Sequence, residues 1–416
     1  MKGNSEISGF YKLSVEKRRK KIMDVVGLSD EEFKAALRIG EADRMIENVI
    51  ALFQFPMGVA TNFQINGKDY LIPMVIEEPS VVAAASNAAR IARIGGGFRS
   101  VCDEPIMMGQ IQINDIRDPF AAKIRVLERK GDILSRANEC DPVLVKLGGG
   151  ALDLETRVID TKSGPMLVVH LLVNVRDAMG ANAVNTMCEA IAPMIGELTE
   201  GKPLLRIISN LATHRMARAW ATFDKGLLGG EDVVNKIIKA YHFADGDPFR
   251  CATHNKGIMN GIDALVIATG NDFRAVEAGA HIYASLGGYH PLTHYEKNEN
   301  GDLVGSIELP VACGTIGGAT SSNPLAKLSL KILGVESAQE LACVIASLGL
   351  AQNLAALRAL SSEGIQRGHM ALHARNITVM AGAVGEEIDI VARKMAEEGK
   401  VRVDRARDIL EEIRRS

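Results

Sequence analysis

Two charged residues flank an apolar run in the segment from His254 to Asp272, with Lys256 near its start and Asp272 at its end. The run DALVIAT, residues 263–269, predicts a buried strand between them. A lysine between two carboxylates can face a substrate oxygen while one carboxylic acid stays protonated. We therefore expect a polar site on an α/β core. The alternative for Asp272 is the N-cap of a helix over 273–286.

Glu78 stands where the apolar strand YLIPMVI ends and a helix predicted over 80–94 begins. The helix N-terminus favours a carboxylate, so a helix-start residue is the plain interpretation. A role as proton donor would require burial or a second carboxylate beside it. Glu77 should face the opposite side of the strand, which leaves Glu78 as the inward candidate.

Three glycine-containing stretches are candidates for anion binding: RDAMGANAVN from Arg176, LGGGA from Leu147 and GTIGGAT from Gly314. DAMGAN follows a predicted strand and opens a helix, the geometry in which backbone N–H groups bind phosphate. None of the three matches G-x-G-x-x-G or a P-loop, so tight turns explain them nearly as well. Asp141, before Pro142, is either a turn residue or an acceptor for a ribose hydroxyl.

Length and composition describe an ordinary globular chain of 416 residues, 47% hydrophobic and 24% charged, long enough for two or three domains. A net charge of -3 gives no electrostatic footprint for nucleic acid. The most apolar stretch, residues 341–357, contains Gly349, Gln352 and Asn353, so we expect no membrane span.

The metal-binding residue types are scattered rather than clustered. The six cysteines are isolated from one another in the sequence, which indicates a reduced, cytoplasmic compartment. His369 and His373 lie one helical turn apart but lack an evident third ligand. A mobile proton donor or a structural pair is the better interpretation of these histidines, and no metal is expected.

Residues 104–208 predict a separate domain inserted into a larger one. The expected order is β-α-β-β-α-β, the split ferredoxin-like motif. The elements are strands over 107–114, 151–159, 165–175 and 203–209, and helices over 118–139 and 180–198.

The larger domain is expected from residues 1–103 and 209–367. Its predicted helices include two short ones within 14–38, a central core helix over 80–94, one after Asn210 through Trp220, one with Pro324 in its first turn and a long one opened by Ser337. Gly364 and Gly368 predict a hinge before a separate helical tail, residues 368–416.

Seven motifs together resemble class II 3-hydroxy-3-methylglutaryl-CoA (HMG-CoA) reductase, the soluble prokaryotic form. They follow the family order from about residue 40 to 376. They are ENVI at Glu47, EEPSVVAAAS at Glu77, DAMGANAVNTM at Asp177, THNKGIMNGI at Thr253, GND at Gly270, GTIGGAT at Gly314 and GHMALHARN at Gly368.

The resemblance implies reduction of HMG-CoA to mevalonate and CoA through mevaldehyde, with two reduced nicotinamide cofactors, or the reverse oxidation of mevalonate. Lys256 would stabilise the developing oxyanion. Glu78 would be the general acid for the aldehyde oxygen, and Asp272 would couple Glu78 to Lys256. His369, on a mobile C-terminal flap, would protonate the departing CoA thiolate.

Substrate contacts also follow from the resemblance. Arg250 would bind the free carboxylate of the HMG group. Further contacts to the substrate would come from Ser80, Asn210, Asn260, Glu47 and Asn48. The family usually has glycine after ENVI, whereas Ala51 follows here, which makes the contacts of Glu47 and Asn48 less secure.

The cofactor is expected to be NADH or NADPH. DAMGAN would bind its pyrophosphate through Asp177, Met179, Gly180 and Asn182. Asp141 aligns with a position where aspartate accepts the ribose hydroxyl and repels a 2′-phosphate, which favours NADH.

The implied fold is α/β (α+β): a large substrate-binding domain with a long central helix, an inserted ferredoxin-like small domain and a helical C-terminal flap. Family members are homodimers or dimer-based homo-oligomers, with the active site completed across the interface. The alternatives are a nicotinamide-dependent reductase of another acyl-CoA and a catalytically silent CoA-binding protein.

Overall fold

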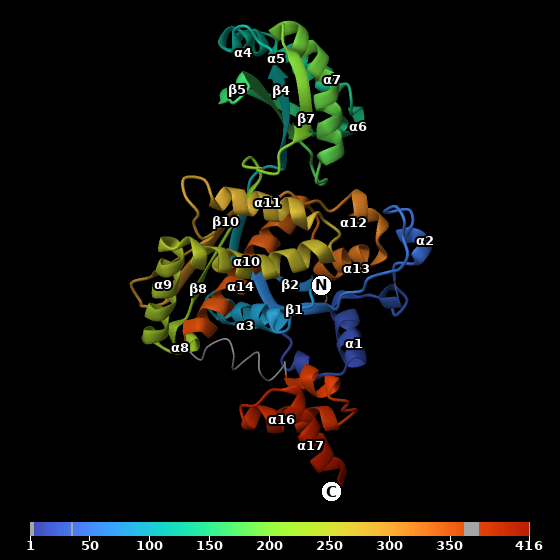
Figure 1. Cartoon of the computed structure of the whole chain (residues 1–416), viewed down its shortest axis with the longest axis vertical. Helices are drawn as coiled ribbons and strands as arrows, with labels where there is room; N and C mark the ends of the chain where they lie inside the picture. Colours follow the sequence, from blue (N-terminus) through green and yellow to red (C-terminus); the bar gives the residue numbers. More distant parts are fainter. Residues whose placement is uncertain (1–3, 35, 362–373, 416) are drawn as a thin grey trace.

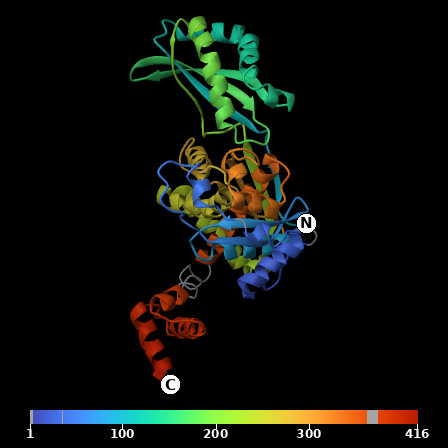
Figure 2. The ribbon, with the colours of Figure 1, turned by 90° about the vertical axis from the view of Figure 1, so that its right-hand side faces the viewer.

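The computed structural model describes residues 4–34, 36–361 and 374–415. The chain is a mixed α/β protein of elongated shape, in which three parts follow one another along the long axis (Figure 1, Figure 2). We name them the β4–β7 unit (residues 106–208), the central unit (described residues up to 105 and from 209 to 361) and the C-terminal unit (residues 374–415).

The β4–β7 unit confirms the predicted order of strands and helices. Its antiparallel sheet has the order β5-β6-β4-β7. The single helix expected over 118–139 is wrong: it is two helices, because Arg129 leaves helical geometry at φ -103° and ψ 16°. The elements are β4 Ile106–Asn114, α4 Pro119–Glu128, α5 Lys130–Asn138, α6 Pro142–Lys146, β5 Gly150–Thr161, β6 Gly164–Asn174, α7 Ala181–Thr199 and β7 Lys202–Ile208.

This unit has a hydrophobic core of its own. Alternate residues of β6, from Leu167 to Val173, point to one face of the sheet and pack with Val184, Met187 and Ile191 of α7. Helices α4, α5 and α7 and the sheet thus bury one common apolar layer, as the split motif requires.

The central unit contains a hairpin, β1-β2, and an antiparallel sheet of order β3-β8-β10-β9. Its strands are β1 Met57–Ile65, β2 Lys68–Val75, β3 Arg99–Cys102, β8 Met216–Phe223, β9 Thr293–Lys297 and β10 Leu303–Pro310. Its helices are η1 Phe10–Lys12, α1 Val15–Val26, η2 Glu32–Lys34, α2 Ile39–Ala42, α3 Val81–Ile94, α8 Lys225–Leu228, α9 Glu231–Gly246, α10 Pro248–Ala268, α11 Phe273–Ala284, α12 Gly318–Ser322, α13 Pro324–Leu333 and α14 Ala338–Ser361.

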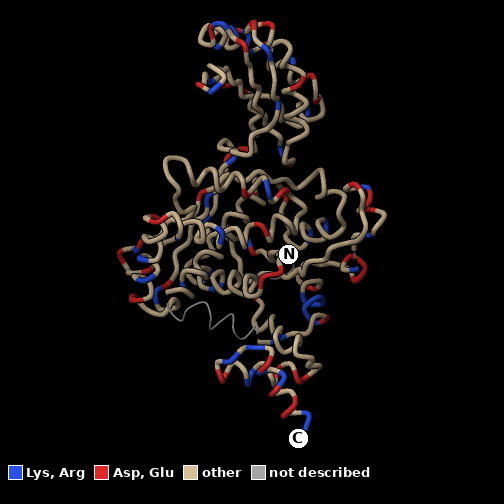
Figure 3. The backbone as a smooth tube through the Cα atoms, in the orientation of Figure 1, with Lys and Arg blue, Asp and Glu red and all other residues tan. Residues whose placement is uncertain are grey.

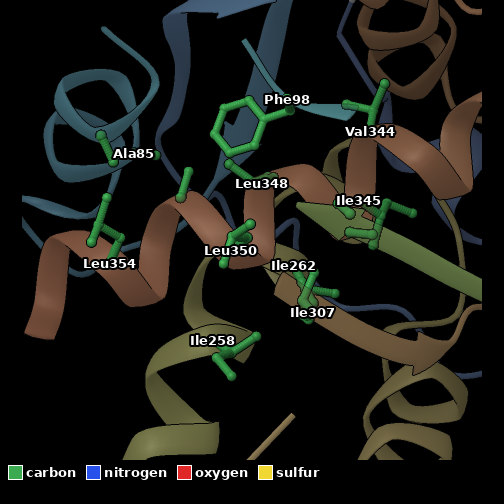
Figure 4. Close-up of a cluster of buried hydrophobic side chains, with 14 of the residues drawn as sticks. Ala85, Phe98, Ile258, Ile262, Ile307, Val344, Ile345, Leu348, Leu350 and Leu354 are labelled. Carbon is green, nitrogen blue, oxygen red and sulfur yellow. The ribbon is translucent and has the colours of Figure 1, made fainter. Parts of the chain in front are cut away.

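Helix α14 lies at the centre of this unit (Figure 4). The Ser337 hydroxyl accepts the Glu340 N–H at 3.1 Å, as the predicted cap requires. Leu348, Leu350 and Leu354 pack against α3, α10 and the sheet. By length and composition alone α14 could cross a membrane, but 78% of its most apolar window is buried inside the protein. Its apolarity is that of a core helix.

Two larger elements of the central unit were predicted wrongly. The helix expected between Asn210 and Trp220 is replaced by strand β8, in which Ala217, Ala219, Ala221 and Phe223 alternate into the core. The strand expected over 263–269 is the last part of helix α10. Because α10 is buried on several sides, its apolar residues form a continuous run that has the same pattern as a buried strand.

The predictions for the N-terminal segment and for helix α3 are confirmed in part. Helix α1 is confirmed, whereas the second short helix is only η2 followed by α2. Ser29 and Glu32 nevertheless form a capping contact, in which the Glu32 carboxylate accepts the Ser29 N–H at 2.8 Å. Helix α3 is confirmed over 81–94, but α10 and α14 are the longer helices of the core.

The C-terminal unit contains the amphipathic helices α16 Glu387–Glu397 and α17 Val403–Arg415. They bury Val391, Met395 and Ile409 in a third, separate core. Acidic and basic residues are interspersed along both helices (Figure 3). The predicted hinge glycines, Gly364 and Gly368, and the candidate His369 lie outside the described residues.

Candidate active site

One face of helix α10 carries the polar residues of the candidate site. A spacing of four, three and four residues places the following side chains on one side of the helix: Lys256, Asn260, Asp263 and Ile267. Lys256 is therefore a mid-helix residue, and the expectation that it flanks a buried strand is wrong. Asn260 lines two neighbouring cavities, one toward each end of α10.

The smaller cavity, of about 570 Å³, contains the acid–base pair. The Lys256 ammonium donates to the Glu78 carboxylate at 3.0 Å, and the Asn260 amide donates to the same oxygen at 3.3 Å. Arg250 and Ser80 line this cavity as well. The structure thus brings together five of the residues singled out from the sequence.

The bend between β2 and α3 directs Glu78 into this cavity. β2 ends at Val75 and α3 begins at Val81, so Glu78 belongs to a short connection rather than to either element. Ser80, the residue before α3, has a left-handed backbone with φ 75° and no side-chain cap bond. A strained non-glycine residue of this kind is a feature of functional sites.

A buried polar network supports α10 beneath the Lys256–Glu78 pair. His254 Nε2 lies 2.7 Å from the Thr293 hydroxyl, which in turn donates to Asn353 Oδ1 at 3.0 Å. Because that hydroxyl has one proton, His254 Nε2 must be the donor. Burial lowers the pKa of His254 to about 3, with a contribution from the charge of Arg250. The imidazole is therefore neutral and structural.

The larger cavity, of about 1150 Å³, is lined by Met179, Gly180 and Asn182 of the DAMGAN motif and by Asp141. Gly180 precedes α7 with φ 100°, and a Cβ there would lie 2.5 Å from Val175. Only glycine suits this turn. Among the described residues, no side chain caps the N-terminus of α7. Its first N–H groups therefore suit a phosphate.

Asp141 and Asp177 make structural bonds that the sequence did not reveal. The Asp141 carboxylate accepts the Leu144 N–H at 2.9 Å and so caps α6. The Asp177 carboxylate accepts the Ala338 N–H at 2.9 Å, at the N-terminus of α14. Asp177 therefore fastens the DAMGAN segment to the central unit, whereas Asp141 caps a helix and lines the cavity at the same time.

Asp272 does not lie beside Lys256 in the same chain. Twelve residues of α10 separate Lys256 from Ala268, about 18 Å of helix rise. The Asp272 carboxylate caps α11 by accepting the Arg274 and Ala275 N–H groups, and it lines the larger cavity. The capping alternative considered from the sequence is confirmed.

Comparison with known proteins agrees with this geometry. The family model described as hydroxymethylglutaryl-coenzyme A reductase matches residues 14–374. The chain is 65% identical to the 3-hydroxy-3-methylglutaryl-coenzyme A reductase of Archaeoglobus fulgidus, over 99% of this chain and 95% of the relative. It is 37% identical to a probable reductase of the same name from Borreliella burgdorferi, over 89% of this chain and 88% of the relative.

A solved structure supports the same assignment. The class II reductase of Streptococcus pneumoniae, bound to NADPH in open conformations, has a TM-score of 0.82 and 40% identity, covering 97% of this chain and 100% of that one. This chain belongs to the hydroxymethylglutaryl-coenzyme A reductase family. It is an oxidoreductase, and the resemblance to class II members is confirmed.

Three residues that the resemblance assigns to the substrate line neither cavity of the described chain. Glu47 and Asn48 are exposed in the connection between α2 and β1, and Ala51 beside them is exposed too. Asn210 is exposed after β7, with its carbonyl beside Gly279. Their assignment to the substrate rests on the family resemblance alone.

Asp263 is a cavity residue that the sequence reasoning missed. It lines the larger cavity, and one of its carboxylate oxygens is buried without a partner among the described residues. Burial, together with the neighbouring Glu277 carboxylate, raises the pKa of Asp263 to about 7. The helical spacing of Asp263 from Lys256 and Asn260 could have identified it as a cavity residue. The prediction of a strand over residues 263–269 prevented this.

Proposed function

We propose that this protein reduces HMG-CoA to mevalonate and CoA in two hydride transfers through mevaldehyde, or catalyses the reverse oxidation. The observation that carries the proposal is the Glu78 carboxylate held between Lys256 and Asn260 beside a second, larger cavity. An acid, a cation and an adjoining cofactor cavity are the parts that a carbonyl reduction needs.

Within the smaller cavity, each side chain suits one part of the substrate. The Lys256 ammonium would face the reacting carbonyl oxygen and stabilise its developing negative charge. Glu78 would give its proton to the aldehyde oxygen in the second reduction. The Arg250 guanidinium is suited to the free carboxylate of the HMG group, with Ser80 and Asn260 beside it. We assign protonation of the CoA thiolate to His369.

The larger cavity would hold NAD(P)H, which when bound supplies the hydride for each reduction. Met179, Gly180 and Asn182 would receive its pyrophosphate at the N-terminus of α7. The NADPH-bound pneumococcal relative supports a nicotinamide cofactor here. We propose NADH as the preferred form, because Asp141 lines the cavity and would repel a 2′-phosphate.

A homodimer, alone or within a larger homo-oligomer, would reconcile Asp272 with its assigned role. In one chain Asp272 and Lys256 line different cavities. We therefore propose that Asp272 of the partner subunit couples to Lys256 and Glu78. Co-expressed Lys256→Ala and Asp272→Ala subunits would then regain activity in the mixed dimer, because one of its two sites has both residues intact. An inactive mixed dimer would contradict this arrangement.

The three units would act as domains with limits at 1–103 with 209–367, 104–208 and 368–416. Their separate hydrophobic cores support this division. The free thiols of all six cysteines support a cytoplasmic location.

The deciding experiment follows nicotinamide absorbance with purified protein and HMG-CoA, with NADH and NADPH supplied separately. We expect oxidation of about two equivalents per HMG-CoA, as a four-electron reduction requires, with release of free thiol. A folded protein that binds HMG-CoA but oxidises neither cofactor would overturn the proposal in favour of a silent CoA-binding protein.

A further inference from the structure

Arg215 is a buried arginine between the β4–β7 unit and the core of the central unit. Only 4% of the residue is exposed. Among the residues that the structure describes, its guanidinium donates to backbone carbonyls and pairs with no carboxylate. One nitrogen donates to Ala178 and Met179, both at 3.3 Å, and the other to Ala178 at 3.3 Å and to Cys313.

These carbonyls belong to two segments that meet at this point. Ala178 and Met179 are part of DAMGAN, and Cys313 precedes Gly314 of GTIGGAT. A Cβ on Gly314 would lie 2.6 Å from the Met179 nitrogen, so the two backbones are in direct contact. The Thr315 N–H donates to the Asp177 carbonyl at 2.8 Å. Arg215 thus closes a backbone-to-backbone junction from the inside.

A buried guanidinium that forms no ion pair among the described residues is costly, and burial lowers the pKa of Arg215 although the charge of Asp177 opposes this shift. The side chain nevertheless stays protonated, because arginine does not lose its proton in proteins. Its planar fork can reach carbonyls of both segments at once, which a single ammonium cannot do. The hydrogen bonds to the carbonyls of both segments must therefore offset the cost of burying the guanidinium.

We propose that Arg215 is a positioning residue for the nicotinamide cofactor, holding Ala178 and Met179 so that the turn at Gly180 and the N-terminus of α7 keep their geometry in the larger cavity. This inference rests on the proposed function, in which that cavity receives NAD(P)H. Arg215 does not line the cavity and acts through the segment it holds.

The test measures the dissociation constants of NADH and NADPH by fluorescence titration for the wild type, Arg215→Lys and Arg215→Met, with no HMG-CoA present. We expect both variants to weaken cofactor binding about tenfold or more, the usual effect of losing hydrogen bonds to a charged group. The KM for HMG-CoA should stay unchanged. Added methylguanidine should restore cofactor binding to Arg215→Ala.

Arg218→Lys is the matched control, because Arg218 lies three residues along and pairs at the surface with Asp103 and Glu308. Folded Arg215 variants that bind the cofactor like the wild type would overturn the inference. If the Arg215 variants do not fold, Gly314→Ala provides the test, because it displaces Met179 while Arg215 stays intact. Unchanged cofactor binding by Gly314→Ala would also overturn the inference. A wild type that binds HMG-CoA but no cofactor would instead overturn the proposed function.

Discussion

The two cavities along α10 use different parts of the chain for recognition. The smaller one presents charged side chains, and its Lys256 side chain is 62% exposed, open to a ligand. The larger one presents a glycine turn and the N–H groups at the start of α7, which are held by buried contacts. Side chains that perform chemistry stay accessible to the ligand, whereas backbone N–H groups that bind a ligand must be held in place by the buried contacts behind them. Variants in the two cavities should therefore fail in different ways.

The largest expected effect separates the cavities most cleanly. Lys256→Ala should lower the turnover of both half-reactions about a thousandfold, because it removes the cation at the developing oxyanion. The affinity for NAD(P)H and the melting temperature should stay near those of the wild type. The measurements are cofactor oxidation with HMG-CoA and with mevaldehyde, and cofactor titration.

Lys239→Ala serves as the control, since Lys239 is an exposed residue of α9 that lines neither cavity. Near wild-type reduction of HMG-CoA by the Lys256→Ala protein would remove Lys256 from the chemistry.

Asn260 lines both cavities and therefore tests whether they act as one site. Asn260→Ala removes the 3.3 Å hydrogen bond to Glu78, so turnover should fall about tenfold, as for other hydrogen bonds to charged groups. Cofactor affinity should not change if Asn260 serves the smaller cavity. Normal turnover with weakened cofactor binding would move its role to the larger cavity.

Asp263 gives the larger cavity a pH dependence near neutral pH. Its pKa of about 7 lies above the unfolded value of about 3.8. Between these values the folded state keeps a proton that the unfolded state has lost, so stability falls as the pH rises from about 4 to about 7. Asp263→Asn should remove this loss and gain about 1–2 kcal/mol at pH 8, after allowance for partial exposure.

Urea unfolding at pH 5 and pH 8 measures this difference. Asp232→Asn is the control, because Asp232 is exposed on α9 and pairs with Lys236. An equal change in stability with pH in the wild type and Asp263→Asn would show that Asp263 does not carry the titration.

Sequence reasoning succeeded where local signals decide the structure. The β4–β7 unit follows from the order of its predicted strands and helices, and its local caps agree, since Asp118 before Pro119 accepts two N–H groups of α4. The Lys256–Glu78 contact followed from motif resemblance, because the two residues are 178 positions apart and no local rule joins them.

Prediction from the sequence failed where burial removes the periodic pattern of apolar and polar residues. α10 is apolar on several faces, so its end was assigned as a strand and Asp263 was overlooked. β8 is rich in alanine, a residue of high helix propensity, and tertiary pairing with β3 and β10 overrides that preference. Arg215 gave no signal, since the burial of an arginine depends on segments far away in the sequence.

The smallest expected effect concerns Asp141, which serves both structure and recognition. Asp141→Asn keeps an oxygen to accept the Leu144 N–H and so preserves the cap of α6, while it removes the negative charge. The preference for NADH over NADPH, measured as the ratio of kcat/KM values, should fall about fivefold because a 2′-phosphate is no longer repelled. Asp118→Asn is the matched control, as Asp118 caps α4 before Pro119 in the same way but lies outside the cavity. An unchanged ratio in Asp141→Asn would mean that Asp141 is a helix cap only, and cofactor choice would then depend on the backbone turn at Gly180.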